Sequence, residues 1–205
     1  MKWFKSLWGF FRRPSTRVPL GLLLLVGIIV GAGGWIGFNG ALGLTNTNEF
    51  CISCHEMEWP YEEYQQSIHY TNRTGVRAGC ADCHVPQANS VKGWFDKMKA
   101  KMWAAKDTYH TILGTYDTKE KYEAGRWEMA NAVWAKMKAR DSQECRNCHN
   151  FEAMNFEEQD RMAQRRHSKA MKTGGTCIDC HKGIAHKEPE EPEEPEEKEA
   201  DAEEK

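Results

Sequence analysis

Residues 1–48 contain no carboxylate side chain, and the first acidic residue is Glu49. Charge of either sign is absent from Val18 to Asn48. The chain as a whole is polar, because 28% of its residues are charged and its mean hydropathy is negative. This composition excludes a polytopic membrane protein. It leaves room for one apolar segment that follows a basic N-terminus.

The apolar segment is long enough to cross a membrane as a helix. Its core is Val18–Phe38, and at about 1.5 Å per residue it spans the ~30 Å hydrocarbon layer of a bilayer. A cleaved signal peptide has a shorter apolar region of about 7–15 residues with small residues at its cleavage site. The stretch Gly40–Gly43 is a poor match to such a site. We therefore predict an uncleaved transmembrane anchor over residues 18–39.

The segment that precedes the anchor, residues 1–17, carries only basic charges. They are Lys2, Lys5, Arg12, Arg13 and Arg17. Because excess positive charge stays on the cytoplasmic side, we predict a cytoplasmic N-terminus and place the rest of the chain outside. Two G-x-x-x-G steps in the anchor, Gly27/Gly31 and Gly33/Gly37, permit close helix contact and are compatible with a homodimer.

The net charge of −2 conceals an asymmetry between the body of the chain and its C-terminal end. Residues 187–205 contribute a charge of −8, whereas residues 1–186 carry +6. The acidic, proline-punctuated end cannot bury a core, and we predict a disordered tail over residues 187–205. The basic body that precedes it suits an acidic partner protein.

No cysteine lies outside a C-x-x-C-H sequence, a motif typical of c-type haem attachment. In this motif both thiols form thioethers with one haem and the histidine binds its iron as the proximal ligand. Zinc knuckles, a thioredoxin-like pair or disulfides would not need a histidine after every second cysteine. We predict four covalent haems c in the periplasm of a bacterium. The four sets are Cys51, Cys54 and His55; Cys80, Cys83 and His84; Cys145, Cys148 and His149; and Cys177, Cys180 and His181.

The spacing of the motifs indicates the fold class. Residues 51–186 provide about 34 residues for each haem, too few to enclose each haem in a conventional core, so the haems themselves must form the core. We predict a mostly α fold with irregular loops over a periplasmic domain of residues 45–186. The motifs fall into two pairs, and each pair encloses one further histidine, which indicates two duplicated di-haem units. The segment 85–144 between them is predicted to be helical, with one helix capped at Asp117.

Four histidines outside the motifs match the number of irons. These distal candidates are His69, His110, His167 and His186. Met57, two residues after His55, is a further candidate for the first haem. Bis-histidine ligation suits low-potential electron transfer, whereas a methionine raises the potential. The residues alone leave open which ligand serves which iron.

The chain resembles the NapC/NirT family of tetrahaem quinol dehydrogenases over nearly its whole length except the tail. The resemblance rests on the single anchor and on the four stretches Cys51–Met57, Asp107–Thr118, Glu144–Asn150 and Cys177–His186. It implies a protein that oxidises menaquinol or ubiquinol and passes electrons to a periplasmic reductase, for nitrate, nitrite or a similar acceptor, or to a soluble cytochrome.

The resemblance also implies roles for individual residues. The first haem would lie beside the quinol pocket, with Met57 as its ligand and Asp107 over its other face. Asp107 is the candidate proton acceptor, and Lys97, Lys99 and Lys101 are candidates for contact with the quinol. His69 and His186 would serve the third and fourth haems, in an order left open. His167 or His110 would then serve the second haem, unless His110 binds the first.

Two other functions compete with quinol oxidation. A passive membrane-anchored electron carrier would lack a quinol site of its own. A terminal reductase needs an open iron position, and the C-x-x-C-K site of multihaem nitrite reductases is absent from the sequence. We therefore expect a quinol:cytochrome-type oxidoreductase.

Overall fold

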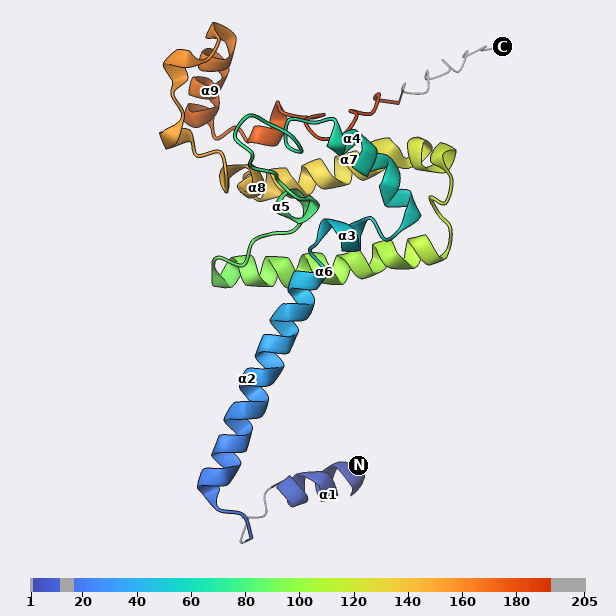
Figure 1. The fold of residues 1–205 in the computed structure, drawn as a ribbon, viewed down its shortest axis with the longest axis vertical. Helices are drawn as coiled ribbons and strands as arrows, with labels where there is room; N and C mark the ends of the chain where they lie inside the picture. The colour runs from blue at the N-terminus through green and yellow to red at the C-terminus, as the bar shows by residue number, and fades with distance from the viewer. Residues whose placement is uncertain (1, 12–16, 193–205) are drawn as a thin grey trace, which may run out of the picture. The chain divides into compact units, whose positions relative to one another are not determined.

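A computed structural model describes residues 2–11 and 17–192, and its ribbon is drawn in Figure 1. The chain divides into two compact units, Met1–Thr45 and Asn46–Lys205. Within the described residues every regular element is a helix and there is no strand. This confirms the predicted mostly α class. The predicted acidic tail begins in the second unit, and its residues 193–205 lie outside the described residues.

The first unit contains the helices α1 (Lys2–Phe11) and α2 (Leu20–Leu44). The 25 residues of α2 span about 37 Å, and this helix is apolar and long enough to cross a membrane. The helix runs on past residue 39, the end of the anchor that stays a prediction, and the Asn39 amide donates to the Trp35 carbonyl at 2.8 Å. The helix continues until Thr45, whose hydroxyl bonds the carbonyl of Ala41 at 3.0 Å.

The second unit combines two long helices with many short ones. The long helices α6 (Val91–Ile112) and α7 (Lys119–Ala139) run in roughly opposite directions (Figure 1). The shorter helices are α3 (Asn48–Cys51), η1 (His55–Met57), α4 (Glu58–Gln65), α5 (Cys80–His84), α8 (Gln143–Arg146), η2 (Phe151–Ala153), η3 (Phe156–Glu158), α9 (Arg161–Thr173) and η4 (Cys177–Asp179). The direct helix contacts join α5 to α3 and α8, and α7 to η4.

The cap of α7 lies one residue later than the sequence pattern predicts. The side chain of Thr118, not of Asp117, accepts from the Lys121 amide at the helix start, at 3.4 Å. Asp117 instead pairs with the Lys121 ammonium at 2.6 Å. A carboxylate that has a cation four residues along the chain is bound by it, and the neighbouring hydroxyl is left to cap the helix.

The second unit has almost no apolar core made by polypeptide alone. Among the described residues only Tyr64, Met137 and Ile178 are buried hydrophobic side chains. A domain of this size with a conventional core would bury many more apolar side chains. The chain is thus arranged as a wrapping, as expected if other groups supply the core.

Candidate haem centres

The second, third and fourth C-x-x-C-H sequences are each wound into a helical turn, whereas the first runs from the end of α3 at Cys51 through an extended Cys54 to the start of η1 at His55. The second motif forms α5 itself, and in the third and fourth motifs the histidine amide donates to the carbonyl of the first cysteine, His149 to Cys145 at 2.8 Å and His181 to Cys177 at 2.9 Å. A turn of this kind brings residues three and four apart to one side of the backbone. All eight cysteines are free thiols, available as the two thioether sulfurs of each attachment.

The first and second motifs contact each other in a similar way to the third and fourth. Asn48, three residues before Cys51, accepts a hydrogen bond from the Cys80 amide at 2.9 Å. Ser142, three residues before Cys145 and fully buried, accepts one from the Ile178 amide at 3.1 Å. The acceptor position is the same in both pairs and the donor differs by one residue, a similarity expected for a duplicated di-haem unit.

The cysteine side chains lie near one another, so that the four motifs adjoin in chain order. Cys51 and Cys80 share a hydrogen bond, which lowers the pKa of Cys51 to about 7 and raises that of Cys80. Burial raises the pKa of Cys145 to about 11, with a further contribution from the adjacent Cys177. Burial also raises the pKa of Cys83, with a smaller contribution from Cys148. The first motif thus adjoins the second, the second the third and the third the fourth.

Three of the motif histidines each face a histidine from elsewhere in the chain. The distances between ring centres are 6.1 Å for His84 and His186, 6.2 Å for His149 and His69, and 6.0 Å for His181 and His167. Two imidazoles bound to opposite sides of one metal, each through a bond of ~2 Å, have ring centres about 6 Å apart. The spacing in all three pairs fits an iron between two axial histidines.

Hydrogen bonds fix the tautomer of two outer histidines. His186 Nδ1 lies 3.1 Å from the Pro60 carbonyl, and His167 Nδ1 lies 2.7 Å from the Gln159 carboxamide oxygen. Because both oxygens only accept, each Nδ1 carries the proton and donates it, which leaves a lone pair on Nε2. This arrangement is common for histidines that bind metals.

The charge state of the second pair also suits metal binding. His84 is accessible to solvent, yet the protein around it desolvates the imidazolium and lowers the pKa of His84 to about 4. Desolvation likewise lowers the pKa of His186. A lowered pKa keeps both rings neutral near pH 7, and the neutral imidazole is the form that binds a metal.

The pairing differs from the one that the family resemblance implies. His186 lies against the second motif and His167 against the fourth, whereas the resemblance assigns His186 to the third or fourth and His167 or His110 to the second. His69 faces the third motif, within the implied choice. Ring contact between residues this far apart in the chain depends on tertiary structure, and the spacing of the motifs carries no signal for it.

The first motif has no such histidine pair among the described contacts. His55 Nε2 lies 3.3 Å from the Asp117 carbonyl, and the Met57 side chain is 39% exposed. His110 bonds Thr115 Oγ1 through Nδ1 at 3.1 Å. The structure thus brings both His55 and His110 to the connection between α6 and α7, where His55 meets the Asp117 carbonyl and His110 meets Thr115.

The candidate quinol residues all lie on α6 and occupy different faces. Lys97 and Lys101 are one turn apart and half-buried, whereas Lys99 is exposed. Desolvation lowers the pKa of Lys101, and the nearby Cys51 opposes this shift. Lys101 is therefore the lysine that lies close to the first motif. Asp107 is exposed, one turn from His110 on the same side of α6.

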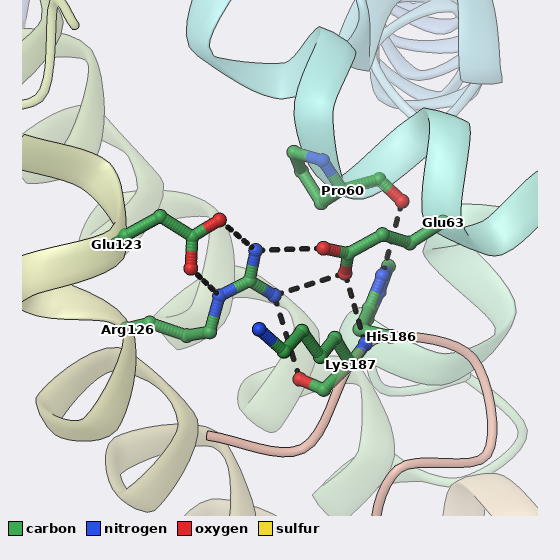
Figure 2. A network of polar contacts seen from close by, with 6 residues as sticks. All are labelled: Pro60, Glu63, Glu123, Arg126, His186 and Lys187. Atoms are coloured by element: carbon green, nitrogen blue, oxygen red, sulfur yellow. Dashed lines mark hydrogen bonds and ion pairs between the residues drawn. The ribbon is translucent and has the colours of Figure 1, made fainter. Parts of the chain in front are cut away.

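Sequence reasoning missed the polar network beside His186, which Figure 2 shows. Its centre is Arg126, which is buried and forms ion pairs with Glu63 and Glu123, both at 2.7 Å. A buried arginine is unusual for its residue type. From the sequence, Arg126 is one of many charges on a helix, and only the fold shows that it is covered.

Four attachment motifs, three histidine pairs and a polypeptide without its own core define a multihaem c-type cytochrome. Within the described residues no three His, Cys, Asp or Glu side chains converge on a metal site of the zinc type. Residues 13–191 match the NapC/NirT cytochrome c family, N-terminal region. The chain belongs to this family.

Several curated relatives cover most of the chain. It is 52% identical to the denitrification system component NirT of Stutzerimonas stutzeri, over 89% of both chains. It is 52% identical to the cytochrome c-type protein NapC of Escherichia coli K12, over 91% of this chain and 90% of that protein. A putative tetraheme cytochrome c of Allochromatium vinosum is 50% identical over 85% of this chain and 90% of that protein. No solved structure matches the chain.

The family membership establishes the coarse character of the molecule. The chain is an electron-transport cytochrome that carries covalent haem c and, within the described residues, has one N-terminal membrane helix. The residues described above fit that group: each motif supplies two free thiols, and three motif histidines have a second imidazole ring about 6 Å away.

Proposed function

We propose that this protein is a quinol dehydrogenase of the bacterial inner membrane, which oxidises menaquinol or ubiquinol and passes the electrons to a periplasmic reductase. The observation that carries the proposal is the continuous series of four attachment motifs, of which three have paired histidines and the first does not. Three saturated sites suit electron transfer alone. One site of different character at the end of the series suits exchange with a substrate.

The proposed ligand set follows from the ring contacts. His55, His84, His149 and His181 are the proximal ligands of the haems attached through their motifs. His186, His69 and His167 are the distal ligands of the second, third and fourth haems, and Met57 is the distal candidate for the first. Each bound haem c supplies a one-electron carrier.

Quinol oxidation releases two electrons and two protons, so the protein must supply a proton acceptor. We assign this role to Asp107, with His110 one turn away on α6 as a second titratable group that can pass the proton outward. Lys101 is the lysine placed to donate a hydrogen bond to the quinol oxygen, because it lies close to the first motif. Lys97, one turn earlier, flanks it.

Electrons leave, in this proposal, at the fourth site through the surface of α9. This helix carries His167 and five exposed basic residues without one acid: Arg161, Arg165, Arg166, Lys169 and Lys172. Basic residues around an electron exit accelerate encounter with an acidic partner. The basic N-terminal segment supports the matching orientation, with the N-terminus cytoplasmic and the haem domain periplasmic.

The experiment mixes the purified full-length cytochrome with a reduced menaquinol analogue, without oxygen, and follows haem reduction in the visible spectrum. Wild type is compared with Asp107→Asn and with the control Asp96→Asn, which lies on the same helix and pairs with Lys92 at 2.7 Å. We expect fast reduction in wild type and Asp96→Asn. Loss of a positioned proton acceptor costs about 100-fold or more in rate, and we expect this loss in Asp107→Asn.

Each alternative outcome has a definite meaning. Haems that dithionite reduces but neither menaquinol nor ubiquinol analogues reduce would contradict the proposal and leave a passive membrane-anchored electron carrier. Equal rates in all three proteins would keep quinol oxidation and remove Asp107 as the proton acceptor.

A further inference from the structure

All three guanidinium nitrogens of Arg126 donate hydrogen bonds to other groups of the protein. Nε and Nη2 donate to Glu123 at 2.7 and 2.8 Å, and Nη2 and Nη1 donate to Glu63 at 2.7 and 2.9 Å (Figure 2). Nη1 also reaches the Lys187 carbonyl at 3.4 Å. Arg126 is only 6% exposed. Two bidentate contacts at one buried arginine are geometrically specific, because they fix the plane of the guanidinium.

These contacts join three segments that are distant in the chain. Glu63 comes from α4, Glu123 and Arg126 come from α7, and Lys187 comes from the segment that follows the fourth motif. The Lys187 amide donates in turn to Glu63 Oε2 at 2.9 Å. Arg126 and Glu63 therefore hold both the amide and the carbonyl of Lys187.

The residue next to Lys187 is His186, and its ring is held by the same helix. His186 Nδ1 donates to the carbonyl of Pro60, which lies one turn before Glu63 on α4. The backbone of the His186 segment and the His186 ring are thus attached to one short helix. That helix is attached to α7 through Arg126.

His186 needs such an attachment more than the other outer histidines do. His167 lies within α9, whose backbone hydrogen bonds hold it in place. The chain around His186 forms only bends and irregular structure from His181 to Pro192. A loop residue without backbone support keeps its geometry only through side-chain contacts.

We infer that Arg126 is a positioning residue for the distal ligand of the second haem: it holds Glu63 and Lys187 so that His186 faces His84. This inference rests on the proposed function for the assignment of His84 and His186 as one axial pair. Without the guanidinium, two half-buried carboxylates would repel each other, and Glu63 would leave the Lys187 amide. His186 would then lose its fixed position opposite His84.

The test uses the full-length, haem-loaded protein and reads the spin state of the ferric haems by EPR and by the near-infrared absorption. The reference is His186→Ala, which removes the proposed ligand and should convert one haem in four to high spin. We expect Arg126→Gln to produce the same high-spin signal, and added imidazole to restore low spin in both variants. Arg126→Lys should give an intermediate signal, because an ammonium cannot bond two carboxylates bidentately.

The matched control is Arg140→Gln at the C-terminal cap of α7. Arg140 pairs at 2.6 Å with Glu144, which is as buried as Arg126 itself. It lies at the opposite end of α7 from Arg126 and has no described contact with the His186 segment. We expect a similar loss of thermal stability in this variant without a high-spin haem.

Several results would contradict the inference. A fully low-spin Arg126→Gln protein with unchanged haem potentials would make Arg126 a structural ion pair only, as would an equal high-spin signal in Arg140→Gln. If Arg126→Gln fails to assemble, Glu123→Gln removes only one of the two carboxylates and should still shift the potential of one haem. A His186→Ala protein that remains fully low-spin would instead overturn the proposed ligand assignment, whatever Arg126 does.

Discussion

The first attachment site and the other three are built from the same motif but have different surroundings. At the second, third and fourth sites, a histidine from another part of the chain lies about 6 Å from the motif histidine. At the first site His55 faces a backbone carbonyl, and Lys101 of α6 lies close to Cys51. In the proposed function, the sites with two histidines carry electrons. The first site, with Asp107 as the proposed proton acceptor, serves a substrate that releases protons.

The largest effects are expected when a proposed iron ligand is removed, and they test whether the first site differs from the other three. His69→Ala should convert one haem to high spin, and Met57→Ala should convert a different one, because each removes one axial ligand. His110→Ala should leave all four haems low-spin. The measurement is EPR of the ferric protein. A high-spin haem in His110→Ala, with none in Met57→Ala, would show that the first site has a histidine pair like the others.

A smaller effect is expected from the lysines of α6. Loss of one hydrogen bond from a charged donor costs about 1.5 kcal/mol or more, so Lys101→Met should slow reduction by a menaquinol analogue about tenfold. Lys99→Met is the matched control, because Lys99 is exposed on another face of the same helix. Stopped-flow spectroscopy under anaerobic conditions measures both rates. Equal slowing would show that the lysines act only through their general charge.

Charge reversal on α9 should change the rate at which electrons leave the protein by several-fold and leave the rate of reduction by quinol unchanged. We expect the double variant Arg165→Glu and Lys169→Glu to slow oxidation of the reduced protein by ferricyanide, an anion. Oxidation by the cation tris(phenanthroline)cobalt(III) should become faster, and both differences should shrink at high salt. The same reversal at Lys92 and Lys99 on α6 is the control. An equal effect from α6 would place the exit away from α9.

The smallest effect concerns acid stability. Hydrogen bonds from Arg126 hold the pKa of Glu123 below its ordinary 4.5. At Glu63, burial acts to raise the pKa, but Arg126 and the Lys187 amide together hold it below 4.5. A carboxylate whose pKa is lower in the folded than in the unfolded state stabilises the fold at any pH above its ordinary pKa. This stabilisation is lost as the pH falls through the lowered pKa of the folded state. Thermal unfolding from pH 6 to pH 3 should therefore show a smaller acid dependence in Arg126→Gln than in wild type.

The parts of this molecule that depend on local sequence were predictable. The helical class, the apolar N-terminal helix and the family follow from short patterns and were confirmed. Local competition caused one small error, the position of the helix cap: Lys121 binds Asp117, so the cap passes to Thr118.

The pairing of the outer histidines was not predictable, because it depends on which segments fold next to each other. The residues alone leave the pairing open, and the family resemblance allows His69 the third haem, against whose motif it lies, but assigns His186 and His167 to other motifs than the ones they face. The burial of Arg126 was not predictable either, because in the sequence a charged residue among the many charges of α7 resembles a solvated surface residue. Both features become visible only when burial and long-range contacts are known.

The position of His186 has a consequence for how the molecule is assembled. His186 contacts Pro60 across 126 residues of chain, so this contact cannot form until most of the chain has been synthesised. The first half of the domain therefore cannot complete it by itself. The segment around His186 completes an arrangement that begins with α4, and a chain truncated before His186 would lack the ring that faces His84.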